Sequence, residues 1–171
     1  VSLLKSQAER CREILLRLSK NPLKLKDKFL EKVKVTDLIK INFEKFNKNK
    51  ELDLIKNFQD HEPEIIYKDE IMYALGNIIQ NAIIYARNNI KAEVTYITKE
   101  IVISISDDGN EFPKDILDKL GEPYISKDNS GMGLGIFIAK NLIENMGGKI
   151  SFKNTIQEGA IVEIRLLNSI S

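Results

Sequence analysis

Residues 69–86 read DEIMYALGNIIQNAIIYA, and this run is the strongest secondary-structure signal in the chain. Its apolar side chains recur at three- and four-residue steps, the spacing of one face of an α-helix. The buried face is expected to hold Ile71, Leu75, Ile78, Ile79, Ala82 and Tyr85. Asn77 and Asn81 stand four residues apart, so both amides lie on one side of this helix and need polar partners.

Further elements are expected on both sides of this helix. One helix is predicted over residues 35–46, with Thr36 as a candidate N-cap, and others over 115–120 and 134–146. Strands are predicted over 52–58, 64–67, 92–97, 100–106, 149–154 and 160–167, and the central pair forms a hairpin around residues 98–99. Helices followed by antiparallel strands predict an α+β layered sandwich with the helices on one face of the sheet.

The first 21 residues form a separate amphipathic segment. Its apolar positions, at helical spacing, are Leu3, Leu4, Ala8, Cys11, Ile14, Leu15 and Leu18. Pro22 ends this helix, because the residue before a proline is disfavoured in the helical conformation. Residues 22–32 are predicted to be a linker and residues 33–171 the compact domain. The chain begins with Val1, so we expect it to be part of a longer protein.

Composition excludes several classes of protein. The 171 residues include 26 Lys and Arg against 25 Asp and Glu, a net charge of +1, which argues against a general nucleic-acid binder. A single cysteine excludes an internal disulfide framework and a four-cysteine zinc site. No apolar run approaches the ~20 residues of a membrane helix, and no signal peptide is visible.

The expected strand over 100–106 leads into Asp107-Asp108-Gly109. A carboxylate at a strand end can accept a hydrogen bond from the exocyclic amine of an adenine, and a glycine lets backbone approach a flat base closely. The alternative is an ordinary turn, since Asp-Gly is a common turn dipeptide.

Residues 131–135 read GMGLG and lead directly into the last predicted helix. A glycine-rich loop that opens a helix presents backbone N–H groups and the positive end of the helix dipole, which favours phosphate binding. The spacing fits neither the dinucleotide fingerprint nor the Walker loop. The amide oxygens of Asn77 and Asn81 suit a hard cation such as Mg²⁺, although a pair of surface asparagines is the plainer alternative.

Together and in this order, the three segments resemble the N, G1 and G2 boxes of the GHKL ATPase superfamily. They are most similar to the ATP-binding catalytic domain of sensor histidine kinases. The resemblance covers roughly residues 33–168, including a lid segment at 122–127 and the closing strand at 159–166. It implies a Bergerat-type fold, with helices on one face of a mixed, mostly antiparallel sheet. Residues 1–21 resemble the second helix of the dimerisation and phosphotransfer hairpin, with features of the RegB-type redox-responding subfamily.

The resemblance implies ATP and Mg²⁺ as cofactors and assigns roles by position. Asn81 would hold Mg²⁺, and Asn77 would support the metal and phosphates. Tyr85 would pack beside the nucleotide, while Asp107 would accept the adenine amine in the space that Gly109 provides. The phosphates would meet Lys127, Gly131, Gly133, Leu134 and Gly135.

Two positions depart from the pattern of the superfamily, and a third distinguishes the chain from the hydrolysing relatives. Glu111 replaces the second glycine of the G1 box, and Ile84 stands where many members carry a basic residue, so ATP affinity is expected to be modest. Asn77 occupies the position at which hydrolysing relatives carry a glutamate general base. An amide cannot abstract a proton at neutral pH, so poor ATP hydrolysis is expected.

The phosphoacceptor histidine is expected to lie outside this chain. The only histidine, His61, falls in a turn before Pro63 and is predicted to be an exposed loop residue. The acceptor would then lie on a hairpin of the same or a partner kinase chain. The resemblance further implies a homodimeric parent protein, a response regulator as partner, and a cytoplasmic domain of a membrane-anchored bacterial sensor.

Alternative functions remain open at this level. The chain could be a degenerate nucleotide-binding module without kinase activity, as Glu111 and Ile84 suggest. A serine kinase acting on a regulatory protein is a third candidate, disfavoured by Asn77 and the hairpin-like first helix. Cys11 is either a small core residue at a helix seam or a redox-sensitive thiol facing a dimer mate.

Overall fold

The computed structural model describes residues 31–47, 49–123, 134–155 and 159–168. The chain divides into two compact units, Val1–Glu31 and Lys32–Ser171. Apart from Glu31, the first unit lies outside the described residues, so the N-terminal helix and the redox role of Cys11 stay predictions. The second unit holds all the elements that follow.

A five-stranded mixed sheet forms one layer of the second unit. Its strand order is β2-β4-β5-β7-β6, in which only β2 and β4 run parallel. The strands are β2 (Glu51–Asn57), β4 (Asn89–Ile97), β5 (Glu100–Asp107), β6 (Lys149–Asn154) and β7 (Ala160–Leu167). A small antiparallel pair joins β1 (Lys32–Lys34) to β3 (Glu64–Ile66). The predicted mixed, mostly antiparallel sheet is confirmed.

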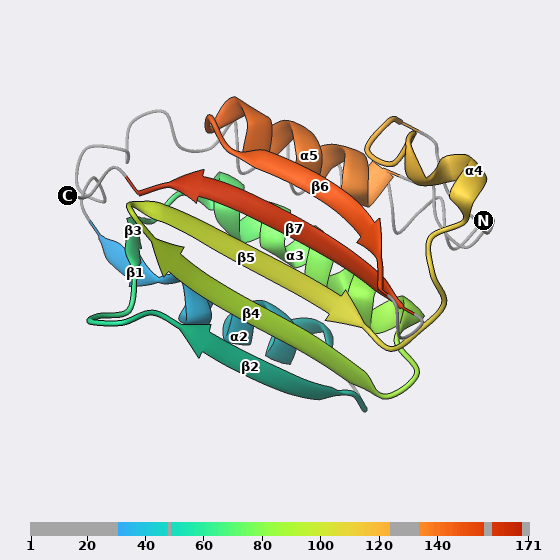
Figure 1. Cartoon of the computed structure of the whole chain (residues 1–171), viewed down its shortest axis with the longest axis horizontal. Helices are drawn as coiled ribbons and strands as arrows, with labels where there is room; N and C mark the ends of the chain where they lie inside the picture. Colours follow the sequence, from blue (N-terminus) through green and yellow to red (C-terminus); the bar gives the residue numbers. More distant parts are fainter. Residues whose placement is uncertain (1–30, 48, 124–133, 156–158, 169–171) are drawn as a thin grey trace. The chain divides into compact units, whose positions relative to one another are not determined.

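Three helices cover one face of this sheet (Figure 1). They are α2 (Val35–Phe46), α3 (Asp69–Tyr85) and α5 (Leu134–Asn145), and a short helix α4 (Lys114–Leu117) follows β5. The core between the layers consists of fully buried aliphatic side chains from both, including Ile39, Ile71, Leu75, Ile78, Ile79, Ile90, Ile101, Ile103, Ile105, Ile143 and Ile164. The α+β sandwich with helices on one face is therefore as predicted.

The β4–β5 hairpin turns at the two predicted residues. Thr98 and Lys99 have φ values of 49° and 70°, the only positive φ values among the described non-glycine residues. Two consecutive positive φ values match the twist of a two-residue hairpin. β4 begins at Asn89 and not at residue 92 as predicted, because its first residues pair with β2 from the Glu51–Asn89 partners onward.

Two details of the helices differ from the prediction. Thr36 is not the N-cap of α2, because Lys34 holds that position without a side-chain hydrogen bond. Thr36 is buried, and its hydroxyl donates to the carboxylate of Glu62, which ties α2 to the segment before β3. In α3, Tyr85 is half-buried, whereas the other five predicted stripe residues are buried.

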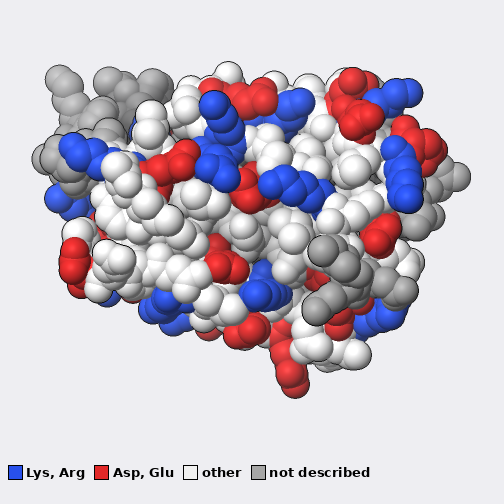
Figure 2. All heavy atoms as spheres, in the orientation of Figure 1, with Lys and Arg blue, Asp and Glu red and all other residues white. Residues whose placement is uncertain are grey.

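The sheet face away from the helices is polar and of mixed charge. Figure 2 shows lysine and arginine interspersed with aspartate and glutamate on this face. Ion pairs cross it, such as Lys153 to Glu163 at 3.6 Å and Arg165 to Glu100 at 3.3 Å, but exposed pairs of this kind add little stability. Among the described helices, none has the length and apolar character to cross a bilayer.

Candidate functional site

The end of β5 places Asp107 at the edge of the helical layer. Its carboxyl is half-buried, and Oδ1 accepts a hydrogen bond of 2.9 Å from the N–H of Gly109. Burial raises the pKa of Asp107 to about 6; the Gly109 N–H opposes this rise, and the charge of Asp108 adds to it. The strand end thus carries a hydrogen-bond acceptor whose charge changes just below neutral pH.

Gly109 passes against the last turn of α3. A Cβ at this position would lie 2.0 Å from the carbonyl oxygen of Tyr85 and 2.8 Å from Oδ1 of Asp107. Such approaches are far inside van der Waals contact, so only a glycine fits between the strand end and the helix. The structure therefore requires this glycine for packing, in addition to the room for a ligand that the sequence predicted.

Asp108 binds the loop that joins α3 to β4. Its carboxylate accepts hydrogen bonds from the N–H groups of Arg87 at 2.7 Å, Asn88 at 3.0 Å and Asn89 at 3.0 Å. Burial works against the charged form, but these hydrogen bonds outweigh it and lower the pKa of Asp108. The two neighbouring acids therefore have different roles: the carboxylate of Asp108 binds the backbone N–H groups of the α3–β4 loop, and that of Asp107 does not.

The predicted polar face of α3 is present. Asn77 is buried and its amide donates to the Tyr73 carbonyl at 3.0 Å, while Asn81 and Tyr85 are half-buried at the next two helical turns. Asn77 and Tyr85 are eight residues apart, which corresponds to ~12 Å along a helix. Ile84 is 62% exposed and lies off this face.

The start of α5 lies against this face of α3. A Cβ on Gly135 would come within 3.6 Å of the amide oxygen of Asn77. The first N–H groups of a helix have no partner within the helix, so this 12-residue helix directs donors and a positive dipole end toward its start at Leu134. Lys127, Gly131 and Gly133, also predicted to meet the phosphates, lie outside the described residues.

The segment after Gly109 is hydrogen-bonded to the end of β6. Asn154 accepts from the Phe112 N–H at 2.8 Å and donates to the Phe112 carbonyl at 2.9 Å, as a neighbouring strand would. The rings of Phe112 and Phe152 pack edge to face, with centroids 6.2 Å apart. Glu111 is exposed and has no positive φ, so its side chain is accommodated without strain. Sequence reasoning missed Asn154, because a single asparagine at a strand end has no distinctive pattern.

Replacing Asn154 with alanine should lower the free energy of unfolding by about 1–3 kcal/mol, because the backbone N–H and the backbone carbonyl of Phe112 both lose their hydrogen-bond partner. Urea denaturation would measure this change. Asn141→Ala is the matched control, since its exposed amide makes one bond to a carbonyl of its own helix and should change stability by only ~0.5 kcal/mol. Equal losses in the two variants would contradict this interpretation of Asn154.

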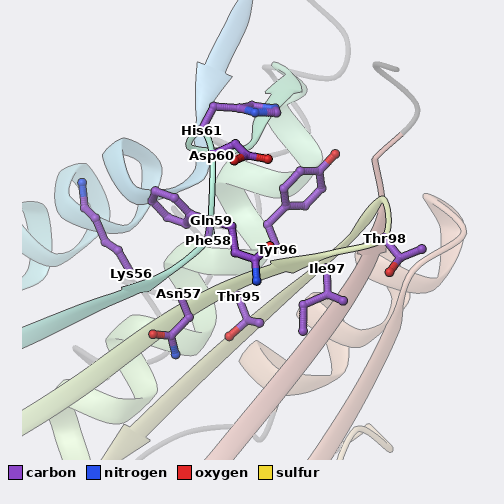
Figure 3. Close-up of a pocket in the computed structure, with 10 residues that line it drawn as sticks. All are labelled: Lys56, Asn57, Phe58, Gln59, Asp60, His61, Thr95, Tyr96, Ile97 and Thr98. Atoms are coloured by element: carbon purple, nitrogen blue, oxygen red, sulfur yellow. The ribbon is translucent and has the colours of Figure 1, made fainter.

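His61 lies at the other end of the sheet from Asp107. It is exposed in the β2–β3 connection, as predicted, and packs edge-on against Tyr96 with ring centroids 5.9 Å apart. Both residues line a pocket of about 670 Å³ where β2 and β4 end, and Figure 3 shows their side chains there. Asp107 pairs with Ile90 at the start of β4, so ~23 Å of strand separates the two regions. His61 is not part of the candidate site.

Comparison with known proteins assigns this arrangement to a family. The family of histidine kinase-, DNA gyrase B- and HSP90-like ATPases matches residues 67–170. That range is more than half of the chain and contains α3, the end of β5 and the start of α5. The chain belongs to this family.

Relatives of this ATPase-family chain include sensor kinases. It is 31% identical to the sensor histidine kinase RegB of Cereibacter sphaeroides over 95% of the chain, and it spans 40% of that relative's length. It is 33% identical to sporulation kinase B of Bacillus subtilis over 61% of the chain and 26% of that protein. The domain is thereby identified as the ATP-binding catalytic type found in sensor histidine kinases.

Solved structures show the same fold. The mycobacterial sensor histidine kinase MprB superposes with a TM-score of 0.70 at 19% identity, covering 81% of this chain and 97% of that one. The catalytic domain of histidine kinase ThkA, in a nucleotide-free form, superposes with a TM-score of 0.66 at 22% identity, covering 81% and 95%. At these identities the likeness concerns the fold alone.

Proposed function

We propose that this domain binds ATP with Mg²⁺ and transfers the γ-phosphoryl group to a histidine on a hairpin that is not part of this chain. The closeness of Gly135 to Asn77 carries the proposal, because it puts the N-terminus of α5 beside the polar face of α3. A phosphate site and an adenine acceptor, Asp107, then lie at opposite ends of one face, as the base and phosphates of an extended nucleotide require.

Each residue of the candidate site would have a separate role. The Asp107 carboxylate would accept the exocyclic amine of adenine, and Tyr85 would pack against the base. Asn77, Leu134 and Gly135 would meet the phosphates, together with the predicted Lys127, Gly131 and Gly133. The amide oxygen of Asn81 would be the protein's ligand to the cation.

The donor set near Asn81 suits magnesium. Within the described ranges, no three His, Cys, Asp or Glu side chains are close enough to hold a metal ion. Mg²⁺ usually keeps several waters and relies on phosphates with one or two protein oxygens, so a single amide oxygen beside a phosphate site fits it. When bound, Mg²⁺ would neutralise charge on the phosphates. Asn77 is held by the Tyr73 carbonyl and has no basic function, so water in the site would not be activated.

The remaining steps concern the longer protein. Phosphoryl transfer depends mainly on positioning and electrostatics, so the acceptor imidazole would be supplied by the hairpin with its own acid–base partner. The product phosphohistidine would pass its phosphoryl group to the receiver domain of a response regulator. We further propose a homodimeric, membrane-anchored parent with this domain on the cytoplasmic side.

Transfer in trans tests this function. Calorimetry with a non-hydrolysable ATP analogue and Mg²⁺ would first establish binding, and a separate histidine-bearing hairpin would then be offered with radiolabelled ATP. Asn81→Ala should reduce transfer by about 100-fold, since an oriented cation on the transferred phosphate is lost. His61→Ala is the control and should leave transfer unchanged.

Three results would overturn parts of the proposal. Nucleotide binding without transfer to any hairpin would favour a degenerate binding module, and label on His61 would make the exposed loop histidine an acceptor. Label on a serine of a partner protein would favour a serine kinase.

A further inference from the structure

Gly159 lies directly against the backbone of Asp107, immediately before the start of β7. It is buried with a φ of +148°, and a Cβ there would lie 2.2 Å from the backbone oxygen of Asp107. Its own carbonyl accepts from the N–H of Thr155 at 3.0 Å, which fixes it in the turn. Any side chain at residue 159 would push the strand end away.

Asp108 holds the same strand end from the opposite direction. Its carboxylate binds three successive N–H groups at residues 87–89, and its own N–H donates to the Asn89 carbonyl at 3.2 Å. The strand end is therefore hydrogen-bonded to the α3–β4 loop on one side and lies directly against Gly159 on the other. Asp107, between them, has little freedom to shift.

We propose that Asp108 and Gly159 are positioning residues that fix the Asp107 carboxylate and thereby make the site selective for a nucleotide with an exocyclic amine on its base. This rests on the proposed role of Asp107 as the adenine acceptor. Hydrogen bonds weaken steeply with distance and angle, so a displaced strand end would lose the bond to the amine while the phosphate contacts at α5 remain.

An effect of the Asp108 charge and an effect of its hydrogen bonds to the loop would change ATP binding in opposite directions when Asp108 is replaced. Its negative charge contributes to the raised pKa of Asp107, so removing the charge alone would favour the ionised acceptor. Asp108→Asn removes the charge but keeps an oxygen for the Arg87 and Asn88 N–H groups. Asp108→Ala removes the charge and every side-chain bond to the loop, and keeps only the backbone bond to the Asn89 carbonyl. Only a positioning role makes the alanine variant the weaker ATP binder.

The test compares ATP with inosine triphosphate, which has the same ribose and phosphates but a carbonyl in place of the amine. Binding constants with Mg²⁺ would be measured by calorimetry for the wild type and for Gly159→Ala, Asp108→Ala and Asp108→Asn. We expect Gly159→Ala and Asp108→Ala to weaken ATP about tenfold or more, inosine triphosphate by less than about twofold, and Asp108→Asn to retain the preference for ATP.

Gly147→Ala is the matched control. Gly147 also lies in a turn with positive φ, +79°, but a Cβ there meets nothing within 4 Å. It should keep the wild-type preference, so that loss of preference in Gly159→Ala is traced to contact with Asp107 and not to a substituted turn glycine.

The outcomes separate the inference from the function on which it rests. A wild type without preference for ATP would remove Asp107 as the acceptor and the inference with it. A wild type that prefers ATP, with the same preference in Gly159→Ala and Asp108→Ala, would overturn the positioning role alone. If Gly159→Ala does not fold, Asp108→Ala against Asp108→Asn decides the question.

Discussion

Replacing Asp107 with asparagine is expected to weaken ATP binding by about 100-fold while stabilising the folded chain at neutral pH. One oxygen of Asp107 accepts from the Gly109 N–H, which leaves the other for a ligand. In asparagine, whichever way the amide turns, its NH₂ faces either Gly109 or the adenine amine. Two donors then meet, and both a bond and its charge are lost.

The effect on stability follows from the raised pKa. The carboxyl of Asp107 has a pKa of about 6 in the folded chain and 3.8 in its ordinary state. Between these values the folded state binds more protons than the unfolded state, so stability falls as pH rises and stays lower above pH 6. Asparagine removes this cost, which is on the order of 1 kcal/mol once solvent screening is allowed for.

Thermal melts of the two chains between pH 4 and pH 8 would measure this difference. The melting temperature of Asp107→Asn should exceed that of the wild type increasingly from pH 4 to pH 7. Asp108→Asn should instead melt below the wild type at neutral pH. The lowered pKa of Asp108 gives the wild type stability that is present above the pKa of the unfolded state and is lost as pH falls through the pKa of the folded state. Equal shifts of the same sign in both variants would contradict this account.

ATP binding by the wild type should weaken in acid for the same reason. At pH 5, one unit below the pKa of about 6, roughly one tenth of the chains carry ionised Asp107, so the apparent affinity falls about tenfold. Inosine triphosphate has the same titrating phosphates, so the ratio of the two affinities isolates Asp107. A ratio that does not change between pH 5 and pH 8 would argue against an ionised acceptor.

The parts of the fold that the sequence predicts well are those with local signals. The apolar period of α3 predicts a helix that ends one residue earlier in the structure, and the Thr98-Lys99 turn lies where the alternating strands place it. Thr36 shows the limit of such reasoning. It has the side chain of a typical N-cap, but its hydroxyl donates a hydrogen bond to Glu62, which is 26 residues away. No local sequence pattern indicates that partner.

In the candidate site, too, the features with a local sequence signal are predictable and the long-range contacts are not. Asp107 and the Asn77–Asn81 pair follow from residue type and spacing, and the structure puts them at one strand end and on one helix face. The contacts that hold the site together escape sequence reasoning, because they join segments far apart in the chain. Gly159 touches Asp107 across 52 residues, and Asn154 binds Phe112 across 42. Asp108 has the same residue type as Asp107, and only its three N–H partners distinguish their tasks.

Replacing Gly109 with alanine is expected to damage both the stability and the nucleotide binding of the chain. Its φ is not among the positive ones, so alanine can adopt the backbone conformation, and the obstacle is space alone. The new Cβ would lie 2.0 Å from the Tyr85 carbonyl oxygen, a backbone atom at the end of α3 that cannot rotate away. Either the strand end or the helix end must move, which we expect to cost about 3 kcal/mol of unfolding free energy.

The same displacement moves Asp107 and Tyr85 apart, so nucleotide binding should be lost along with stability. Urea denaturation and calorimetry with the ATP analogue would measure the two effects on one preparation. Gly147→Ala supplies the contrast, since its φ of +79° imposes strain but its Cβ meets no neighbour. It should lose only ~1 kcal/mol and bind nucleotide normally. If Gly109→Ala were no less stable than Gly147→Ala, the contact between β5 and the end of α3 would not be the constraint that shapes this site.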